Sequence, residues 1–210
     1  MSIATMLLTV IAVLIFFGLL QRVLDRMYLT DRAALLLVGC MFVGTLLPNL
    51  VIGRAQVNVG GCLIPLGVCV YLLLRTDTVR ERVRACVGAL VTAAAIYLLG
   101  RFMPNEPETM PVDPLLIYSL TAGVVACLLG RSRRGAFICG VVGVLLADVV
   151  NAVLQWSRGV EQTLVLGGAG LADAVVISGV FAVLITEIVG EIAERVSRKV
   201  KKVGEKSKSQ

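Results

Sequence analysis

Residues 135–154, GAFICGVVGVLLADVVNAVL, form an apolar stretch with a single charged residue, Asp148. About 20 helical residues span the hydrocarbon core of a bilayer. Similar apolar runs occupy most of the remaining chain, at residues 3–20, 33–52, 59–74, 85–103, 114–130 and 163–186. The chain is 58% hydrophobic over 210 residues, more than one soluble domain of this size can bury in its core. We therefore predict an all-α fold, a polytopic bundle of transmembrane helices.

The basic residues alternate between the two sides of this predicted bundle. With seven spans, the even-numbered loops contain only Arg54, Arg101 and Arg158, and the odd-numbered loops and the C-terminal tail contain the rest of the 20 Lys and Arg residues. Cytoplasmic loops accumulate Lys and Arg. The pattern predicts seven spans, with the N-terminus outside and the C-terminus inside. The same pattern explains the net charge of +6 by membrane topology and by contact with anionic lipid, and not by nucleic-acid binding.

Composition divides the chain into two parts. Residues 1–190 form the predicted seven-span membrane domain, and residues 191–210 form a basic tail in which apolar residues recur every three or four positions. This spacing predicts an amphipathic helix that contacts anionic lipid of the inner leaflet, with a disordered end at 204–210. The Pro-rich acidic loop at 104–113 is expected to be a stiff connector on the outer side.

Two aspartates, Asp148 and Asp173, lie within apolar runs, where a charged side chain is costly and usually faces a protein interior or a wet cavity. The predicted topology puts them in the outer half of the bundle on adjacent antiparallel helices, so they can approach each other. Asn151 shares a helix face with Asp148, and Asn58 lies at the outer end of the third span. Two close carboxyl groups can share a proton and act as acid and base. We predict Asp148 and Asp173 as a candidate catalytic dyad.

Two glycine-rich stretches accompany the aspartates, VNVGGCLIP at 57–65 and GGAG at 167–170. Glycine weakens a helix, and irregular backbone is tolerated at membrane depth only beside protein or water. Interrupted helices with free carbonyl groups bind ions in many transporters. We therefore expect the binding residues to be Asn151, Asn58, Gly60, Gly61, Gly167, Gly168 and Gly170. The alternative is that these glycines only permit close helix crossings.

Three motifs together resemble an uncharacterised prokaryotic membrane family, the domain of unknown function 1614. They are NVGGCLIP at 58–65, ADVVN at 147–151 and GGAGLADAVVISG at 167–179. The resemblance covers roughly residues 45–190 and implies a multi-pass integral membrane protein, in the cytoplasmic membrane of a prokaryote. It implies no activity.

A looser similarity connects the chain to intramembrane aspartyl proteases of the presenilin and signal-peptide-peptidase type. Those proteins carry a catalytic aspartate in each of two successive spans, the second within a G-x-G-D motif. The similarity implies that Asp148 and Asp173 are the catalytic pair. In this chain Asp173 follows Gly170 by three residues, no tyrosine precedes Asp148, and there is no P-A-L motif.

Three functions remain open from the sequence. The chain has no histidine, which excludes an H-E-x-x-H zinc site, a Ser–His pair and haem ligation by histidine. The first function is hydrolysis of a transmembrane peptide by an aspartyl dyad. The second is cation- or proton-linked transport, in which Asn151 and backbone carbonyls complete an oxygen shell. The third is a non-catalytic scaffold. No resident metal or cofactor is expected, and the oligomeric state is left open.

Overall fold

The computed structural model describes residues 18, 31–76, 78–102, 114–130, 132–170 and 173–208. The predicted first span at 3–20, apart from Gly18, and the acidic loop at 104–113 lie outside the described residues. Helices dominate the described part, which confirms the all-α class. They are α2 (Asp31–Leu46), α3 (Ile64–Leu74), α4 (Val79–Phe102), α5 (Pro114–Gly130), α6 (Arg133–Ser157) and α7 (Ala174–Lys208), and a π-helical turn, η1 (Val59–Leu63), leads directly into α3.

Three of these helices contain an apolar segment long enough to cross a membrane. These segments are Val79–Phe102, Arg133–Ser157 and Ala174–Ala193. Shorter apolar segments lie in α2, in η1 with α3, and in α5. The long segments coincide with predicted spans, and they indicate a membrane protein.

Helix α6 is the centre of the bundle and packs against α3, α4, α5 and α7. Small residues let it approach its neighbours closely, as is typical of membrane helices. A Cβ atom on Gly140 would collide with the backbone of Ser178 and Gly179 on α7. At the same crossing, the Ser178 hydroxyl donates a hydrogen bond of 3.0 Å to the Gly140 carbonyl oxygen. The position of α6 in the fold is therefore set by contacts on several sides.

A small three-stranded sheet is the part of the fold that the sequence did not predict. Strands β1 (Leu50–Ile52) and β2 (Ala55–Val57) form an antiparallel hairpin, and β3 (Leu164–Leu166) pairs with β2 in parallel. The predicted spans at 33–52 and 163–186 had assigned β1 and β3 to helices. That assignment is wrong because a short apolar run has the same composition in a strand as in a helix.

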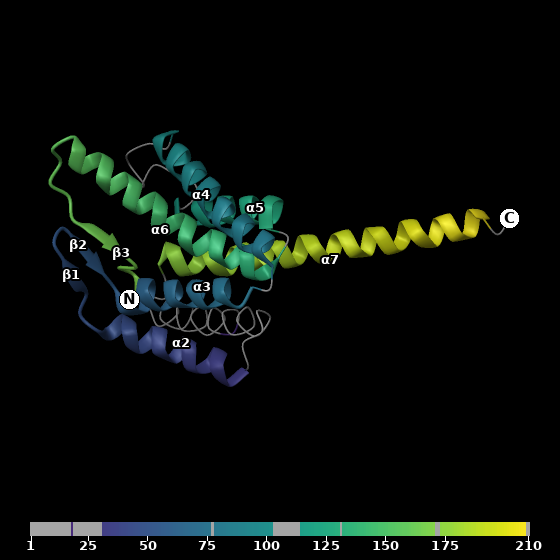
Figure 1. Ribbon diagram of the computed structural model, residues 1–210, viewed down its shortest axis with the longest axis horizontal. Helices are drawn as coiled ribbons and strands as arrows, with labels where there is room; N and C mark the ends of the chain where they lie inside the picture. The colour runs from purple at the N-terminus through teal and green to yellow at the C-terminus, as the bar shows by residue number, and fades with distance from the viewer. Residues whose placement is uncertain are drawn as a thin grey trace, which may run out of the picture.

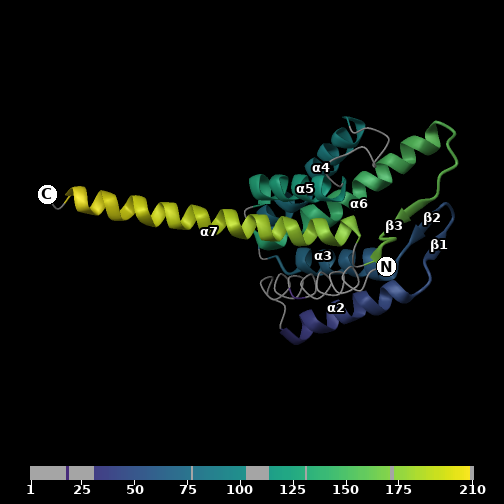
Figure 2. The same ribbon diagram turned by 180° about the vertical axis from the view of Figure 1, so that it is seen from behind.

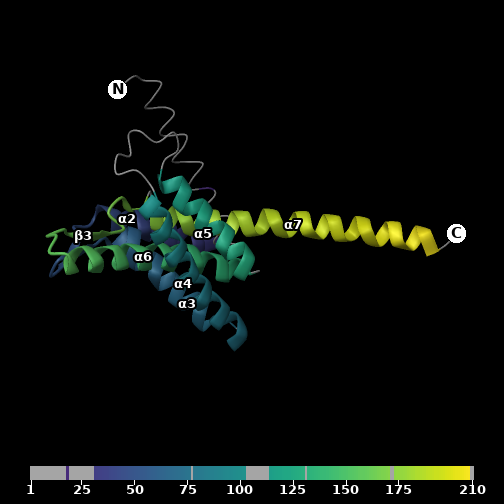
Figure 3. The same ribbon diagram turned by 90° about the horizontal axis from the view of Figure 1, so that it is seen from above.

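The sheet and the C-terminal end of α7 lie at opposite ends of the molecule (Figure 1). Figure 2 shows the same arrangement from behind. Seen from above, α7 continues as one helix well beyond its neighbours (Figure 3). The helix runs to Lys208, over residues for which the Lys- and Ser-rich composition predicted disorder from position 204. Lys and Glu are good helix formers, so this composition does not end the helix.

Candidate binding cavity and glycine junction

A cavity of about 570 Å³ lies near the sheet end of the bundle. Its walls come from the last turns of α4, from α5, from the second half of α6, and from β3 with the loop before it. Most of the side chains around it are polar. These are Tyr97, Arg101, Tyr118, Asp148, Asn151, Gln155, Arg158, Gln162 and Thr163.

Helix α6 supplies a polar stripe to this cavity. Asp148, Asn151, Gln155 and Arg158 all line it, and their spacing of three, four and three residues puts them on one helix face. Asp148 is partly buried, and among the described residues its carboxylate makes no hydrogen bond. Asn151, which was predicted to share this face, lines the same cavity but makes no hydrogen bond to Asp148. Asp148 is therefore a partly buried carboxylate in an apolar helix, and it lines a cavity with mostly polar walls.

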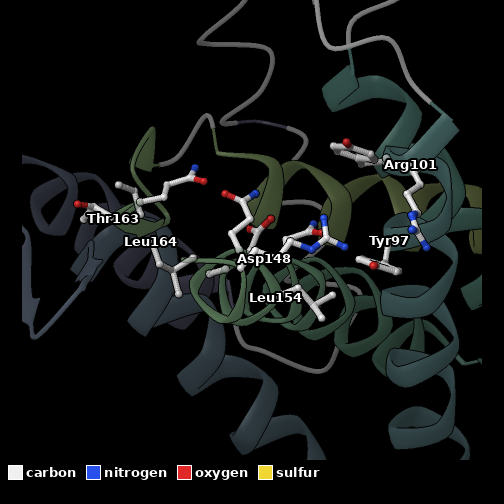
Figure 4. A pocket seen from close by; sticks show the side chains of 14 residues that line it. Tyr97, Arg101, Asp148, Leu154, Thr163 and Leu164 are labelled. Atoms are coloured by element: carbon white, nitrogen blue, oxygen red, sulfur yellow. The ribbon is translucent and has the colours of Figure 1, made fainter. Parts of the chain in front are cut away.

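Two arginines share this cavity with Asp148. Arg101 comes from the last turn of α4 and Arg158 caps the end of α6. Figure 4 shows Arg101 and Tyr97 on one side of Asp148, with Thr163 and Leu164 on the other. From the sequence, both arginines were interpreted only as loop charges, with no predicted role at the candidate site. The structure corrects this, because helix ends bring both arginines to the wall of the cavity.

Asp173 has a different environment, at the start of α7. One carboxylate oxygen accepts a hydrogen bond of 3.0 Å from the backbone N–H of Val175, and the other accepts one of 3.2 Å from Ala169. This is the geometry of a helix N-cap. Asp173 does not line the cavity, but it lies close enough to Asp148 for the two carboxyl groups to interact electrostatically.

Four of the predicted glycines form a close crossing, which we call the glycine junction: Gly60, Gly61, Gly167 and Gly170. A Cβ atom on Gly61 would collide with backbone atoms of Gly167 and Gly170, and one on Gly60 would collide with α2. Gly167 and Gly170 also have positive φ angles of 71° and 62°, which side-chain-bearing residues rarely adopt. None of the four lines the cavity. The junction brings backbone segments into contact, as the packing alternative expected.

Asn58 belongs to this junction and not to the cavity. It is 3% exposed, and its side-chain oxygen accepts a hydrogen bond of 3.0 Å from the N–H of Gly61. Its side-chain nitrogen donates one of 2.9 Å to the side-chain oxygen of Asn49, and its backbone N–H donates one of 2.9 Å to the Leu166 carbonyl. Asn58 thus caps η1 and ties it to the sheet. Gly168 is exposed and lies outside both the cavity and the crossing.

Most of these elements lie within a region that matches a known protein family. A family model described as "Protein of unknown function (DUF1614)" matches residues 49–185. The chain belongs to the DUF1614 family. No match was found among curated proteins or among solved structures. The DUF1614 region includes the sheet, the glycine junction and every residue that lines the cavity.

The chemistry available in this DUF1614 protein follows from its side chains. Among the described residues, the cavity lining offers one carboxylate, two guanidinium groups, amides and hydroxyls. The described residues include no group of three or more His, Cys, Asp and Glu side chains that could hold a metal ion. Of the predicted site residues, Asp148 and Asn151 are at the cavity. The predicted roles of Asp173, Asn58 and the glycines in catalysis or binding remain predictions, beside the backbone roles that their contacts give them.

Proposed function

We propose that this chain binds a small polar solute in the cavity beside Asp148 and carries it across the membrane. The observation that supports the proposal is the partly buried Asp148 carboxylate, which faces the cavity and makes no hydrogen bond with the described residues. Ionisable groups at membrane depth commonly mark a solute or ion pathway. A volume of about 570 Å³ is within the range of ligand pockets. The polar lining indicates a hydrophilic solute.

We further propose that the chain has seven spans in the cytoplasmic membrane of a prokaryote, with the N-terminus outside and the C-terminus inside. Hydrogen bonds between segments predicted to lie on the same side of the membrane support this topology. Arg134 donates a bond of 3.2 Å to the Arg75 carbonyl, which joins two predicted inner loops at the end away from the sheet. At the sheet end, the N–H of Leu164 donates one of 3.0 Å to the Arg54 carbonyl, which joins the outer end of the predicted seventh span to a predicted outer loop. The basic tail, 191–210, would then contact anionic lipid of the inner leaflet.

A second candidate function is hydrolysis of a transmembrane peptide by Asp148 and Asp173. The occurrence of the two carboxyl groups in successive apolar runs favours it, because two close carboxyl groups can share a proton. The N-cap bonds of Asp173 count against it, because both of its oxygens already accept backbone hydrogen bonds. A catalytic pair would also need to share one water molecule, and only Asp148 lines the cavity. We therefore place solute binding first.

The two functions are separated by two conservative substitutions tested in proteoliposomes. In the first assay, uptake of radiolabelled amino acids, carboxylates, sugars and cations is measured for the full chain and for Asp148→Asn and Asp173→Asn. We expect Asp148→Asn to abolish uptake and Asp173→Asn to retain it, because Asn also caps helices well. Val153→Ala is the matched control, since Val153 lies on α6 but is 51% exposed and does not line the cavity.

The contrary results are equally specific. Uptake by Asp148→Asn at the wild-type rate would refute the transport proposal. In a second assay, cleavage of a reconstituted transmembrane peptide that is lost in both aspartate variants would establish the hydrolase instead.

A further inference from the structure

The cavity carries charges of both signs for which the described residues supply no partner. Arg101, Arg158 and Asp148 line one cavity. Within the described ranges, none of the three side chains makes a salt bridge or a hydrogen bond. Asp148 is partly buried, where a charge without a partner is costly, and Arg101 and Arg158 are exposed at the ends of their helices. A solute that pairs with all three groups must therefore carry both a negative and a positive charge.

We propose that the solute is a small zwitterion, whose anionic group binds Arg101 and Arg158 and whose ammonium group binds Asp148. This inference rests on the proposed solute-binding function and specifies its ligand. Guanidinium groups bind carboxylates and phosphates through paired hydrogen bonds. An ammonium group has three donors for the carboxylate oxygens of Asp148 and for nearby amides.

The positions of the charges along α6 predict the orientation in which the zwitterion binds. Asp148 precedes Arg158 by ten residues, which corresponds to about 15 Å along a helix axis. Arg101 and Arg158 both stand at the ends of their helices, so the guanidinium groups mark the mouth of the cavity. Asp148 marks its deeper part. The ammonium group thus enters first, and the anionic group stays nearer the outer surface.

Singly charged solutes fit these walls less well. A simple anion would satisfy the arginines but would leave Asp148 unpaired and beside a like charge. A simple cation would pair with Asp148 but would lie near two guanidinium groups. Such unpaired or repelling groups are how a site rejects related ligands. Because the cavity carries charges of both signs, it should bind a zwitterion more tightly than the corresponding anion or the corresponding cation.

The test compares zwitterions with their singly charged halves. The full chain is purified into nanodiscs of phosphatidylcholine and phosphatidylglycerol. Binding of glycine and 4-aminobutyrate is then measured by calorimetry, with acetate, butyrate and butylamine as matched controls. We expect at least one zwitterion to bind about tenfold or more tightly than its matched anion and than butylamine, because it gains a charged hydrogen bond that each control lacks.

Variants then assign each end of the ligand. Asp148→Asn should remove the preference for zwitterion over anion, and Arg101→Gln or Arg158→Gln should remove the preference over butylamine. The wild-type comparison decides the question even if a variant fails to fold. Equal binding of zwitterion and anion, a preference that survives Asp148→Asn, or binding of no zwitterion at all would overturn the inference.

The same zwitterionic chemistry can come from a dissolved amino acid or from a lipid headgroup. Repeating the titration in nanodiscs that contain phosphatidylethanolamine distinguishes them. Unchanged affinity for the dissolved zwitterion supports the dissolved source, and weakened affinity through competition supports the headgroup. Uptake of a singly charged or neutral solute without a zwitterion preference would refute this inference and leave the transport proposal standing.

Discussion

The cavity and the glycine junction are neighbouring polar regions of one bundle, but their polar groups are used differently. At the junction, Asn58 accepts a hydrogen bond from a backbone N–H group at the start of η1, and Asp173, at the start of α7, accepts two from backbone N–H groups. At the cavity, Asp148 lies in the middle of α6 and has no such group to bind. A polar side chain at a helix start can satisfy the protein itself. One in the middle of a membrane helix needs a partner from elsewhere. This contrast predicts that substitutions at the junction affect stability and those at the cavity affect binding.

The largest effect on stability is expected from Gly167→Ala. The new Cβ atom would collide with the backbone of Gly61 and Cys62, and the residue would keep an unfavourable φ of 71°. We expect a loss of about 3 kcal/mol or more in the free energy of unfolding, measured by thermal unfolding in detergent. Gly67→Ala is the control, because a Cβ atom there meets no atom within 4 Å. Similar melting temperatures for the two variants would refute the close crossing.

Asn58→Ala should be the next most damaging change. It removes both side-chain hydrogen bonds of a buried residue and leaves the Gly61 N–H without its acceptor. The expected loss is about 2–3 kcal/mol, and Asn49→Ala, which removes only one of these bonds, should cost less. A double-mutant cycle of the two positions measures their coupling. Additive effects would contradict the hydrogen bond between them.

Asp173→Ala should destabilise the protein by about 1 kcal/mol, the usual cost of losing an N-cap. Asp173→Asn should melt closer to the wild type than Asp173→Ala, because its one side-chain oxygen can still accept the N-cap bond from Val175, although the bond from Ala169 is lost. Thermal unfolding of the two variants in parallel checks this prediction. Equal destabilisation by Ala and Asn would contradict the N-cap role and would point to a role of the negative charge in stability.

The smallest effect on stability is expected from Asp148→Asn, within about 0.5 kcal/mol of the wild type. No hydrogen bond to the described residues is lost, and an unpaired charge is removed from a partly buried position. Uptake should nevertheless be abolished in proteoliposomes. A large loss of stability together with normal uptake would reverse the contrast between the two regions, and would make Asp148 a structural residue.

Sequence patterns predicted the helices well and the sheet poorly. The apolar runs containing α4, α6 and α7 are long enough to identify helices by length alone. The runs that include Leu50–Ile52 and Leu164–Leu166 are continuous with helical sequence, and nothing in their composition marks the change to strand. The parallel pairing of β2 with β3 depends on residues far apart in the chain, which a local pattern cannot detect.

The candidate site was predicted in part. The cost of a carboxylate in an apolar run identified Asp148, and helical spacing placed Asn151 beside it. The same spacing extends to Gln155 and Arg158 and could have identified the whole stripe. Asp173 carried an overlooked signal of its own, because an aspartate after a glycine-rich loop and before an apolar run is typical of a helix N-cap. Arg101 reaches the cavity only through the packing of α4 on α6, which is not a sequence property.

The parallel pairing of β2 with β3 has a consequence for biosynthesis. Residues 55–57 emerge from the ribosome more than 100 residues before their partners at 164–166. Until then, β2 is an open edge whose backbone groups lack their later partners. Closure of the sheet is therefore a late event that waits until α6 and β3 have been synthesised. A nascent chain stopped before residue 164 would expose this edge to chaperones and proteases, and the arrival of β3 would end that exposure.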